Sequence, residues 1–198
     1  KVSGIMLNQT PVRDEDLAVL KQTPQLDILA LRNTKITDAG VSSLSHVVLL
    51  RKLDVSGTNV TDGGLDALQS LTVLQELNLA RTSVSDAGVS KLAGLTSLTS
   101  LDLSETTITD SSLSALSQIP GLKTLILDKC NLTDDGIASL KNCKSLTLLS
   151  LAGIPLTGRF LKELNGVPLE NLNLADSHCD GSEFKDLAAG QTLKNLFL

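Results

Sequence analysis

The sequence has few of the residues that usually form tight binding anchors or catalytic centres. Among its 198 residues there is no tryptophan and no tyrosine, with three phenylalanines, two histidines and one methionine. Interface hot spots favour tryptophan, tyrosine and arginine, so a deep aromatic anchor is poorly supported. The two histidines, His46 and His178, lie far apart and lack the spacing of a metal-binding helix. The sequence thus gives little basis for histidine chemistry.

Motifs for phosphate, dinucleotide and acyl-transfer chemistry are missing as well. The chain has no GxSxG, no GxxxxGK and no dinucleotide fingerprint. An enzyme is expected to show a convergent set of reactive groups, and none is visible, so we expect no catalytic residues, no cofactor and no metal. The net charge of −5 and pI near 5.0 argue against a nucleic-acid partner. No apolar run approaches the roughly 18 residues that suggest a membrane span.

What the sequence does contain is a repeat of 24 residues. The segment 31–44, LRNTKITDAGVSSL, recurs at 55–68 as VSGTNVTDGGLDAL and three more times further on. Each unit begins with two apolar residues two positions apart, and one late step is 23 residues. The pairs are Ile5/Leu7, Leu29/Leu31, Leu53/Val55, Leu77/Leu79, Leu101/Leu103, Leu125/Leu127, Leu149/Leu151, Leu172/Leu174 and Leu196/Leu198. The register predicts a single domain over 1–198, with about eight repeats and a terminal strand.

Each unit predicts a short strand, a corner and a short helix. The alternating apolar pair indicates a strand, and the following Asp-x-Gly-Leu-x-x-Leu segment has the spacing of one helix face. Thr37 or Asp38 would cap the first such helix. Successive strands must be parallel and about 4.8 Å apart, whereas helices need roughly 8–10 Å. The array should therefore curve, with strands inside and helices outside.

The recurring polar residues of the corner are expected to stabilise the fold of each unit. Threonines recur at 10, 34, 58, 82 and 106, and we expect their hydroxyls to bond the backbone of the adjacent corner. The repeating aspartates are interpreted as helix caps and the repeating glycines as sites of close packing. The seventh unit replaces this pattern with Ile154, Pro155, Gly158 and Phe160. We predict a local irregularity at 153–160.

The three cysteines also fit the repeat. Cys130, Cys143 and Cys179 form no disulfide framework or metal spacing, and each occupies an inward-facing position of its unit. They are interpreted as small buried apolar residues. Three unpaired cysteines of this kind favour a cytoplasmic location.

The repeat LxxLxLxxTxITDxGLxxL resembles a leucine-rich repeat over essentially residues 2–198. The Thr/Cys corner and the TDxGL segment are most similar to the cysteine-containing type and to Thr-rich bacterial arrays. The resemblance implies an α/β fold, a right-handed leucine-rich-repeat solenoid shaped as a curved horseshoe. It implies a parallel sheet on the concave face, short helices on the convex face, and recognition of another protein as the usual role.

The candidate binding surface consists of strand residues that the repeat leaves free on the concave face. A polar centre with both charge signs is followed by two apolar residues that should be diagonal neighbours on exposed sheet. The predicted residues are Lys52, Asp54, Glu76, Asn78, Asp102, Ile126 and Leu148.

Three functions remain open at this stage. The first is a non-enzymatic protein-recognition module, expected to be one part of a longer protein. The second is an accessory region that positions substrate for a larger enzyme, and the third is a structural spacer or self-assembling rod. The chain has no cysteine-rich flank and stops at a strand, so weak end-to-end self-association is an expected behaviour of the rod.

Overall fold

Nine short parallel strands form one sheet in chain order in the computed structural model, which describes residues 2–184 and 192–198. The strands are β1 (Gly4–Met6), β2 (Ile28–Ala30), β3 (Lys52–Asp54), β4 (Glu76–Asn78), β5 (Ser100–Asp102), β6 (Thr124–Ile126), β7 (Leu148–Ser150), β8 (Asn171–Asn173) and β9 (Asn195–Phe197). Every neighbouring pair keeps the repeat register, as in Leu53 opposite Leu77. The nine predicted strands are confirmed.

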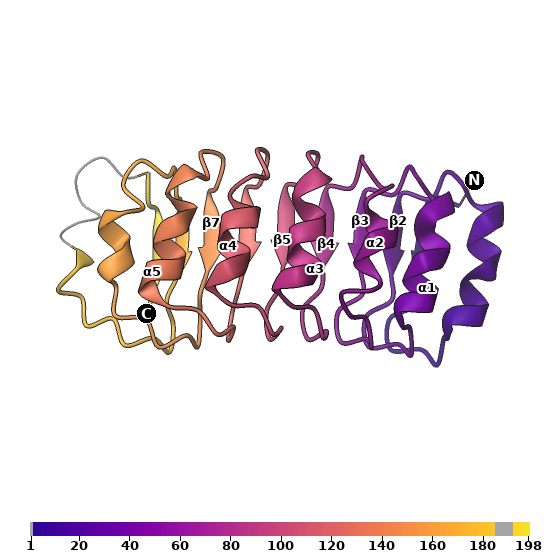
Figure 1. Cartoon of the computed structure of the whole chain (residues 1–198), viewed down its shortest axis with the longest axis horizontal. Helices are drawn as coiled ribbons and strands as arrows, with labels where there is room; N and C mark the ends of the chain where they lie inside the picture. Colours follow the sequence, from indigo (N-terminus) through magenta and orange to yellow (C-terminus); the bar gives the residue numbers. More distant parts are fainter. Residues whose placement is uncertain (1, 185–191) are drawn as a thin grey trace.

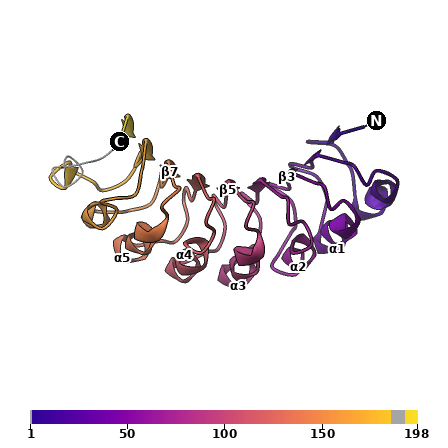
Figure 2. The same cartoon turned by 90° about the horizontal axis from the view of Figure 1, so that it is seen from above.

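Short helices cover one face of the sheet (Figure 1). The α-helices are α1 (Asp38–Ser42), α2 (Leu65–Leu68), α3 (Asp86–Ser90), α4 (Asp110–Leu116) and α5 (Asp134–Ile137). Short 3-10 helices complete this layer: η1 (Asp14–Gln22), η2 (Ser43–His46), η3 (Lys91–Gly94), η4 (Ala138–Asn142) and η5 (Arg159–Lys162). Viewed from above, the molecule is an arc with strands on the inside and helices on the outside (Figure 2). The predicted right-handed, curved solenoid is confirmed.

The core is a continuous apolar layer between sheet and helices. The first strand leucine of the central units is at most 2% exposed, at Leu29, Leu53, Leu77 and Leu101. The apolar side chains of each coil pack only against those of the neighbouring coils, as expected for a solenoid.

The cysteines join the same core as free thiols, with Cys130 and Cys143 buried and Cys179 half-buried against it. Burial raises the pKa of the Cys143 thiol to about 11. The interpretation of the cysteines as core residues is confirmed.

The corner threonines do not form the predicted ladder between coils. The Thr34 hydroxyl donates to the carbonyl of Leu31 in its own coil at 2.6 Å, and Thr58 repeats this bond to Val55. The backbone already ties adjacent corners, because the amide of Leu31 donates to the Asp54 carbonyl and that of Asn33 to Ser56. The prediction was wrong because the carbonyl that needs a donor lies within the tight corner itself.

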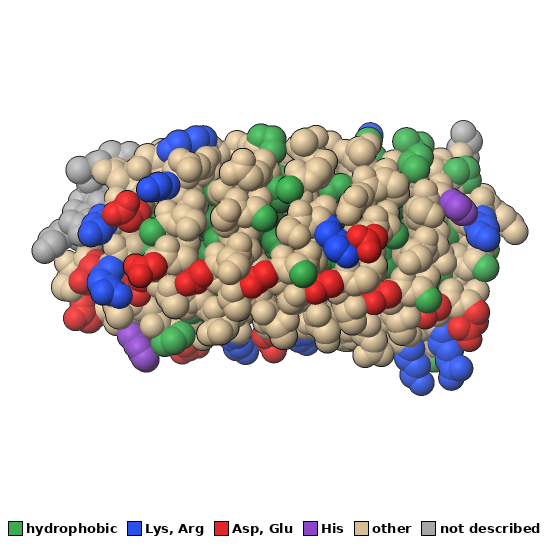
Figure 3. Space-filling view, in the orientation of Figure 1, with side chains coloured by type: hydrophobic (Ala, Val, Ile, Leu, Met, Phe, Trp, Pro, Cys, Tyr) green, Lys and Arg blue, Asp and Glu red, His purple; other side chains and the backbone are tan. Residues whose placement is uncertain are grey.

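The aspartates at the start of the helices provide the side-chain link between coils. Asp38 accepts the amide of Thr61 at 2.7 Å and its hydroxyl at 2.6 Å, although Thr61 belongs to the next coil. Of the two predicted caps, Thr37 is the cap, since its hydroxyl accepts the Ala39 amide. The same link joins Asp14 to Thr37, Asp62 to Ser85, Asp86 to Thr109 and Asp110 to Thr133. Figure 3 shows acidic side chains in a row across this face.

The repeating glycine makes room for that carboxylate. A Cβ added to Gly88 would overlap Oδ1 of Asp62, and the same holds for Gly136 against Asp110. Ser112 occupies this position in α4 and donates its hydroxyl to Asp86. The Thr, Asp and Gly of the repeat therefore form one connected unit across two coils.

The predicted irregularity at 153–160 is confirmed. Gly158 precedes η5 with φ +92°, and this coil has a 3-10 turn in place of an α-helix. Phe160 stands at the glycine position and is buried. Both bonds from Thr157 go to Oδ2 of Asp134, at 3.0 and 3.1 Å. Oδ1 of Asp134 is consequently buried without a hydrogen-bond partner.

Replacing the ladder aspartates should cost different amounts along the array. Asp86→Ala removes three hydrogen bonds and should lower the free energy of unfolding by about 1–3 kcal/mol. Asp134→Ala should cost about 1 kcal/mol less, because it also removes an unpartnered buried oxygen. Urea denaturation of both variants measures the difference. Equal losses would contradict the assigned difference between the two coils.

The ladder should also make stability depend on pH. Burial alone would raise the pKa of the Asp86 carboxyl, but hydrogen bonds from Ser112 and Thr109 outweigh it and hold the pKa below its ordinary value of 3.8. The unfolded chain then binds more protons, so this stability is present above that value and lost as the pH falls below it. Asp86→Asn should flatten the decline between about pH 5 and about pH 2 in denaturation series, whereas exposed Glu15→Gln serves as the control.

Candidate recognition surface

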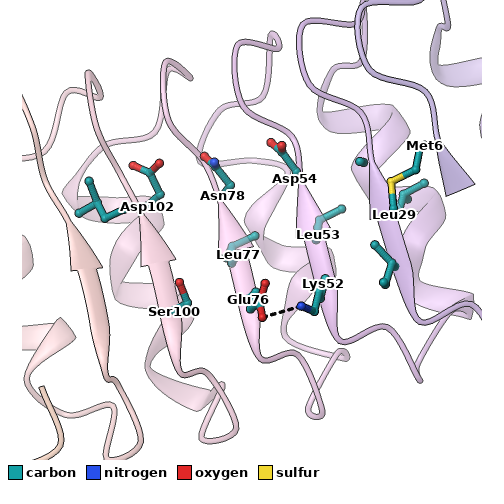
Figure 4. Close-up of a pocket in the computed structure, with 13 residues that line it drawn as sticks. Met6, Leu29, Lys52, Leu53, Asp54, Glu76, Leu77, Asn78, Ser100 and Asp102 are labelled. Atoms are coloured by element: carbon teal, nitrogen blue, oxygen red, sulfur yellow. Dashed lines mark ion pairs between the residues drawn. The ribbon is translucent and has the colours of Figure 1, made fainter. Parts of the chain in front are cut away.

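The structure brings all seven predicted residues to the concave face. Five line one shallow hollow of about 320 Å³, namely Lys52, Asp54, Glu76, Asn78 and Asp102. Ile126 borders this hollow and a second one of about 610 Å³, which Leu148 also lines. Figure 4 shows the first hollow, with Asp54, Asn78 and Asp102 side by side near the ends of their strands.

One ion pair crosses the polar centre. Lys52 and Glu76 are paired residues on β3 and β4, and their charged atoms lie 2.8 Å apart. Their side chains are 46% and 49% exposed, so water screens the attraction and the pair contributes little stability. Among the described residues, Lys52 is the one lysine that lines this hollow, and the pair neutralises it.

Asp54, Asn78 and Asp102 also accept hydrogen bonds from the backbone, although the repeat pattern predicted that their side chains have no structural role. Oδ1 of Asp54 accepts the backbone amide of Ser56 at 2.9 Å, and Oδ1 of Asp102 accepts that of Ser104 at 3.0 Å. Asn78 accepts the amide of Ala80 in the same way. These are Asx turns, in which a short polar side chain satisfies the backbone two residues further on. The Asp-x-Ser spacing is the sequence signal that points to them.

The concave face carries unpaired negative charge. Within residues 2–184 and 192–198, no lysine or arginine nitrogen lies within ion-pair distance of Asp54, Asp102 or Asp128. Asp128 was not predicted, yet it lines the second hollow and its Oδ1 accepts the Ser150 hydroxyl and the Ala152 amide. Each of these three aspartates accepts its hydrogen bonds through Oδ1. The surface should attract a basic group.

Apolar side chains lie on both sides of the acidic centre. Towards the C-terminus, Ile126 and Leu148 share the larger hollow with Phe197, which is 56% exposed. Towards the N-terminus, Met6 is 61% exposed and borders the first hollow together with Ile28. The N-terminal apolar group was missed, although its residues occupy the same repeat positions as Ile126 and Leu148.

The register sets these residues in one line across the strands. The residues at the third position of β1 to β6 pair one to the next, so their side chains share a face of the sheet. We call this line the central row; it consists of Met6, Ala30, Asp54, Asn78, Asp102 and Ile126. The central row therefore runs from apolar through acidic to apolar.

Comparison with known proteins agrees with this architecture. One leucine-rich-repeat model matches residues 72–132, and a second matches residues 26–45 and 49–68. The chain is a leucine-rich-repeat protein. Among solved structures, this leucine-rich-repeat chain is similar to an internalin C2 from Listeria monocytogenes, with 25% identity and a TM-score of 0.80. The similarity covers 99% of this chain and 80% of that one. No curated protein matches the sequence.

The family has a general role that is known at the level of the whole domain. Leucine-rich-repeat domains generally act in protein–protein contacts and not in catalysis, and the bacterial neighbour agrees with the expected likeness to bacterial arrays. Within the described part of this leucine-rich-repeat protein, no cluster of His, Cys, Asp and Glu is suited to hold a metal ion. Its described helices are all too short or too polar to cross a membrane.

The ion pair between Lys52 and Glu76 should position side chains more than it stabilises the fold. A double-mutant cycle with Lys52→Met and Glu76→Gln is expected to give a coupling free energy of about 0.5 kcal/mol. The coupling should fall further in molar salt, because exposed charges are screened. A coupling above about 2 kcal/mol in urea denaturation would contradict this interpretation.

Proposed function

We propose that this leucine-rich-repeat protein is a non-enzymatic recognition module that binds another protein on its concave sheet. The observation that carries the proposal is the central row with its two hollows, where acidic and apolar side chains face outward from a rigid sheet. Solvated sheet normally carries mostly polar side chains, so adjoining exposed apolar residues indicate a contact surface.

The rigidity of the surface supports this role. Asp54 and Asp102 each have one oxygen fixed by a backbone amide, so the other oxygen of each carboxylate is held in place. Binding to such groups therefore costs the module little side-chain entropy.

The composition of the surface indicates how the binding free energy is distributed. Phe197 supplies the one aromatic ring among the described residues that line the two hollows, so the binding free energy must come from several modest contacts.

The proposal is tested by reversing the surface in a triple variant, Asp54→Arg, Asp102→Arg and Leu148→Arg. A protein that is wild type except for a photo-crosslinking residue in place of Asn78 is first used to capture a partner from the native lysate. The partner is then purified. The triple variant should bind this purified partner about 100-fold more weakly by calorimetry, since it loses three contacts and adds repulsion.

A second triple variant provides the matched control. Glu15→Arg, Asp135→Arg and Glu163→Arg place three arginines on the exposed helix side and add one more unit of positive charge than the concave variant does. It should bind the partner like the wild type, and thermal unfolding must show that both variants remain folded. Wild-type affinity in the concave variant, with the fold intact, would refute the concave site.

A further inference from the structure

The order of side chains along the central row specifies the chemistry of the bound segment, if the concave sheet is the recognition surface proposed above. We propose that the partner contributes an extended segment of seven residues with the pattern apolar–x–basic–x–basic–x–apolar. The segment lies across the strands, and its alternate side chains point into the concave face.

The spacing of the strands sets this pattern. Neighbouring strands are about 4.8 Å apart, so Asp54, Asp102 and Ile126 lie about 5, 14 and 19 Å from Ala30 along the row. An extended chain advances about 3.3 Å per residue and presents every second side chain to one face. Side chains of the segment then reach the sheet at about 0, 7, 13 and 20 Å. These points fall within about 2 Å of the apolar, acidic, acidic and apolar positions of the row.

Each end of the segment meets an apolar site of suitable shape. At the N-terminal end, buried Ala30 forms a floor beside Met6 and Ile28, all of which border the first hollow. At the other end, Ile126 adjoins the larger hollow with Leu148. A medium-sized aliphatic side chain at each end would cover these groups from water.

The centre of the segment must be basic. Asp54 and Asp102 are half-buried and have no cation partner within the described part of the chain. Lys52 is paired with Glu76, so it does not neutralise them. Asn78 lies between the two aspartates in the row and separates two sites of negative charge. Two lysines or arginines, spaced two residues apart, meet both.

The curvature of the sheet favours an extended chain over a helix. The strands follow the inner side of an arc (Figure 2). A straight helix laid across a concave surface would contact the sheet only at the two helix ends, and a gap would remain under the middle of the helix. An extended chain can bend at each residue and follow the arc. A second copy of this protein does not supply the segment, because its sequence contains no two basic residues two positions apart.

The test uses two fluorescein-labelled peptides of identical composition. The matched peptide is Gly-Leu-Ser-Lys-Ser-Lys-Ser-Leu-Gly, and the swapped peptide is Gly-Lys-Ser-Leu-Ser-Leu-Ser-Lys-Gly. Fluorescence anisotropy should show that the matched peptide binds about tenfold more tightly, and added salt should reduce the difference. Equal binding of the two peptides, or no binding of either, would overturn the proposed pattern.

Variants then locate the contact. The double variant Asp54→Asn and Asp102→Asn keeps the Oδ1 acceptors but removes both charges, and it should bind the matched peptide no better than the swapped one. Glu15→Gln with Glu163→Gln removes two charges from the helix side and should leave binding unchanged. Unchanged preference in the aspartate variant, or loss of preference in the helix-side variant, would also refute the proposal.

The two proposals fail separately. If the peptides show no order preference but the Arg triple variant still loses its protein partner, the segment pattern is wrong and the concave surface stands. If the Arg triple variant keeps its partner, both are wrong. Peptide-independent dimers that the aspartate variant abolishes in sedimentation would assign the surface to a second copy and overturn the segment.

Discussion

The structure depends on repeated coils that stack with their strands in one register. Backbone hydrogen bonds hold neighbouring strands at the spacing of a parallel sheet, while the helices behind them need about twice that distance. The sheet therefore lies on the inside of an arc (Figure 2). On the outer side, the Asp-to-Thr bonds from one coil to the next hold the helix starts at their wider separation. Register, curvature and the exposed columns of side chains all follow from these two sets of bonds.

The concave aspartates combine two tasks that sequence reasoning treats as alternatives. Asp54 and Asp102 complete the backbone hydrogen bonding of their own corners through Oδ1, yet they also form the acidic part of the surface. A residue of this kind is selected for its acceptor atom, which asparagine also provides, as Asn78 does. The choice of aspartate over asparagine adds charge without changing the local fold. Charge is thus a property of the row that can change while the acceptor atom of each corner is kept.

The strands, the curved helix layer and the irregular seventh unit could be predicted because they depend on short-range spacing and burial. The link from Asp38 to Thr61 could not, because it joins residues 23 apart, and such contacts depend on how far one coil is displaced from the next. The threonine bonds failed for a related reason, since the carbonyl that needs a donor depends on the corner geometry. The seven concave residues were placed correctly on one face. The apolar group around Met6 was missed although the repeat positions of Met6 and Ile28 match those of Ile126 and Leu148. The backbone bonds were missed because they depend on the geometry of each corner, which the repeat positions do not describe.

The short seventh unit shows why the helix side can change without disturbing the recognition surface. Its step is 23 residues because one residue, Pro168, separates Val167 from Leu169, whereas two residues separate Leu71 from Leu74. The same coil also departs from the repeat on its helix side, where a 3-10 turn replaces an α-helix and Asp134 of the preceding coil has an unpartnered oxygen. On the sheet, Leu149 still pairs with Leu172 in register. The backbone ladder is therefore the stronger constraint, and it keeps side chains aligned across the concave face where the outer layer departs from the repeat.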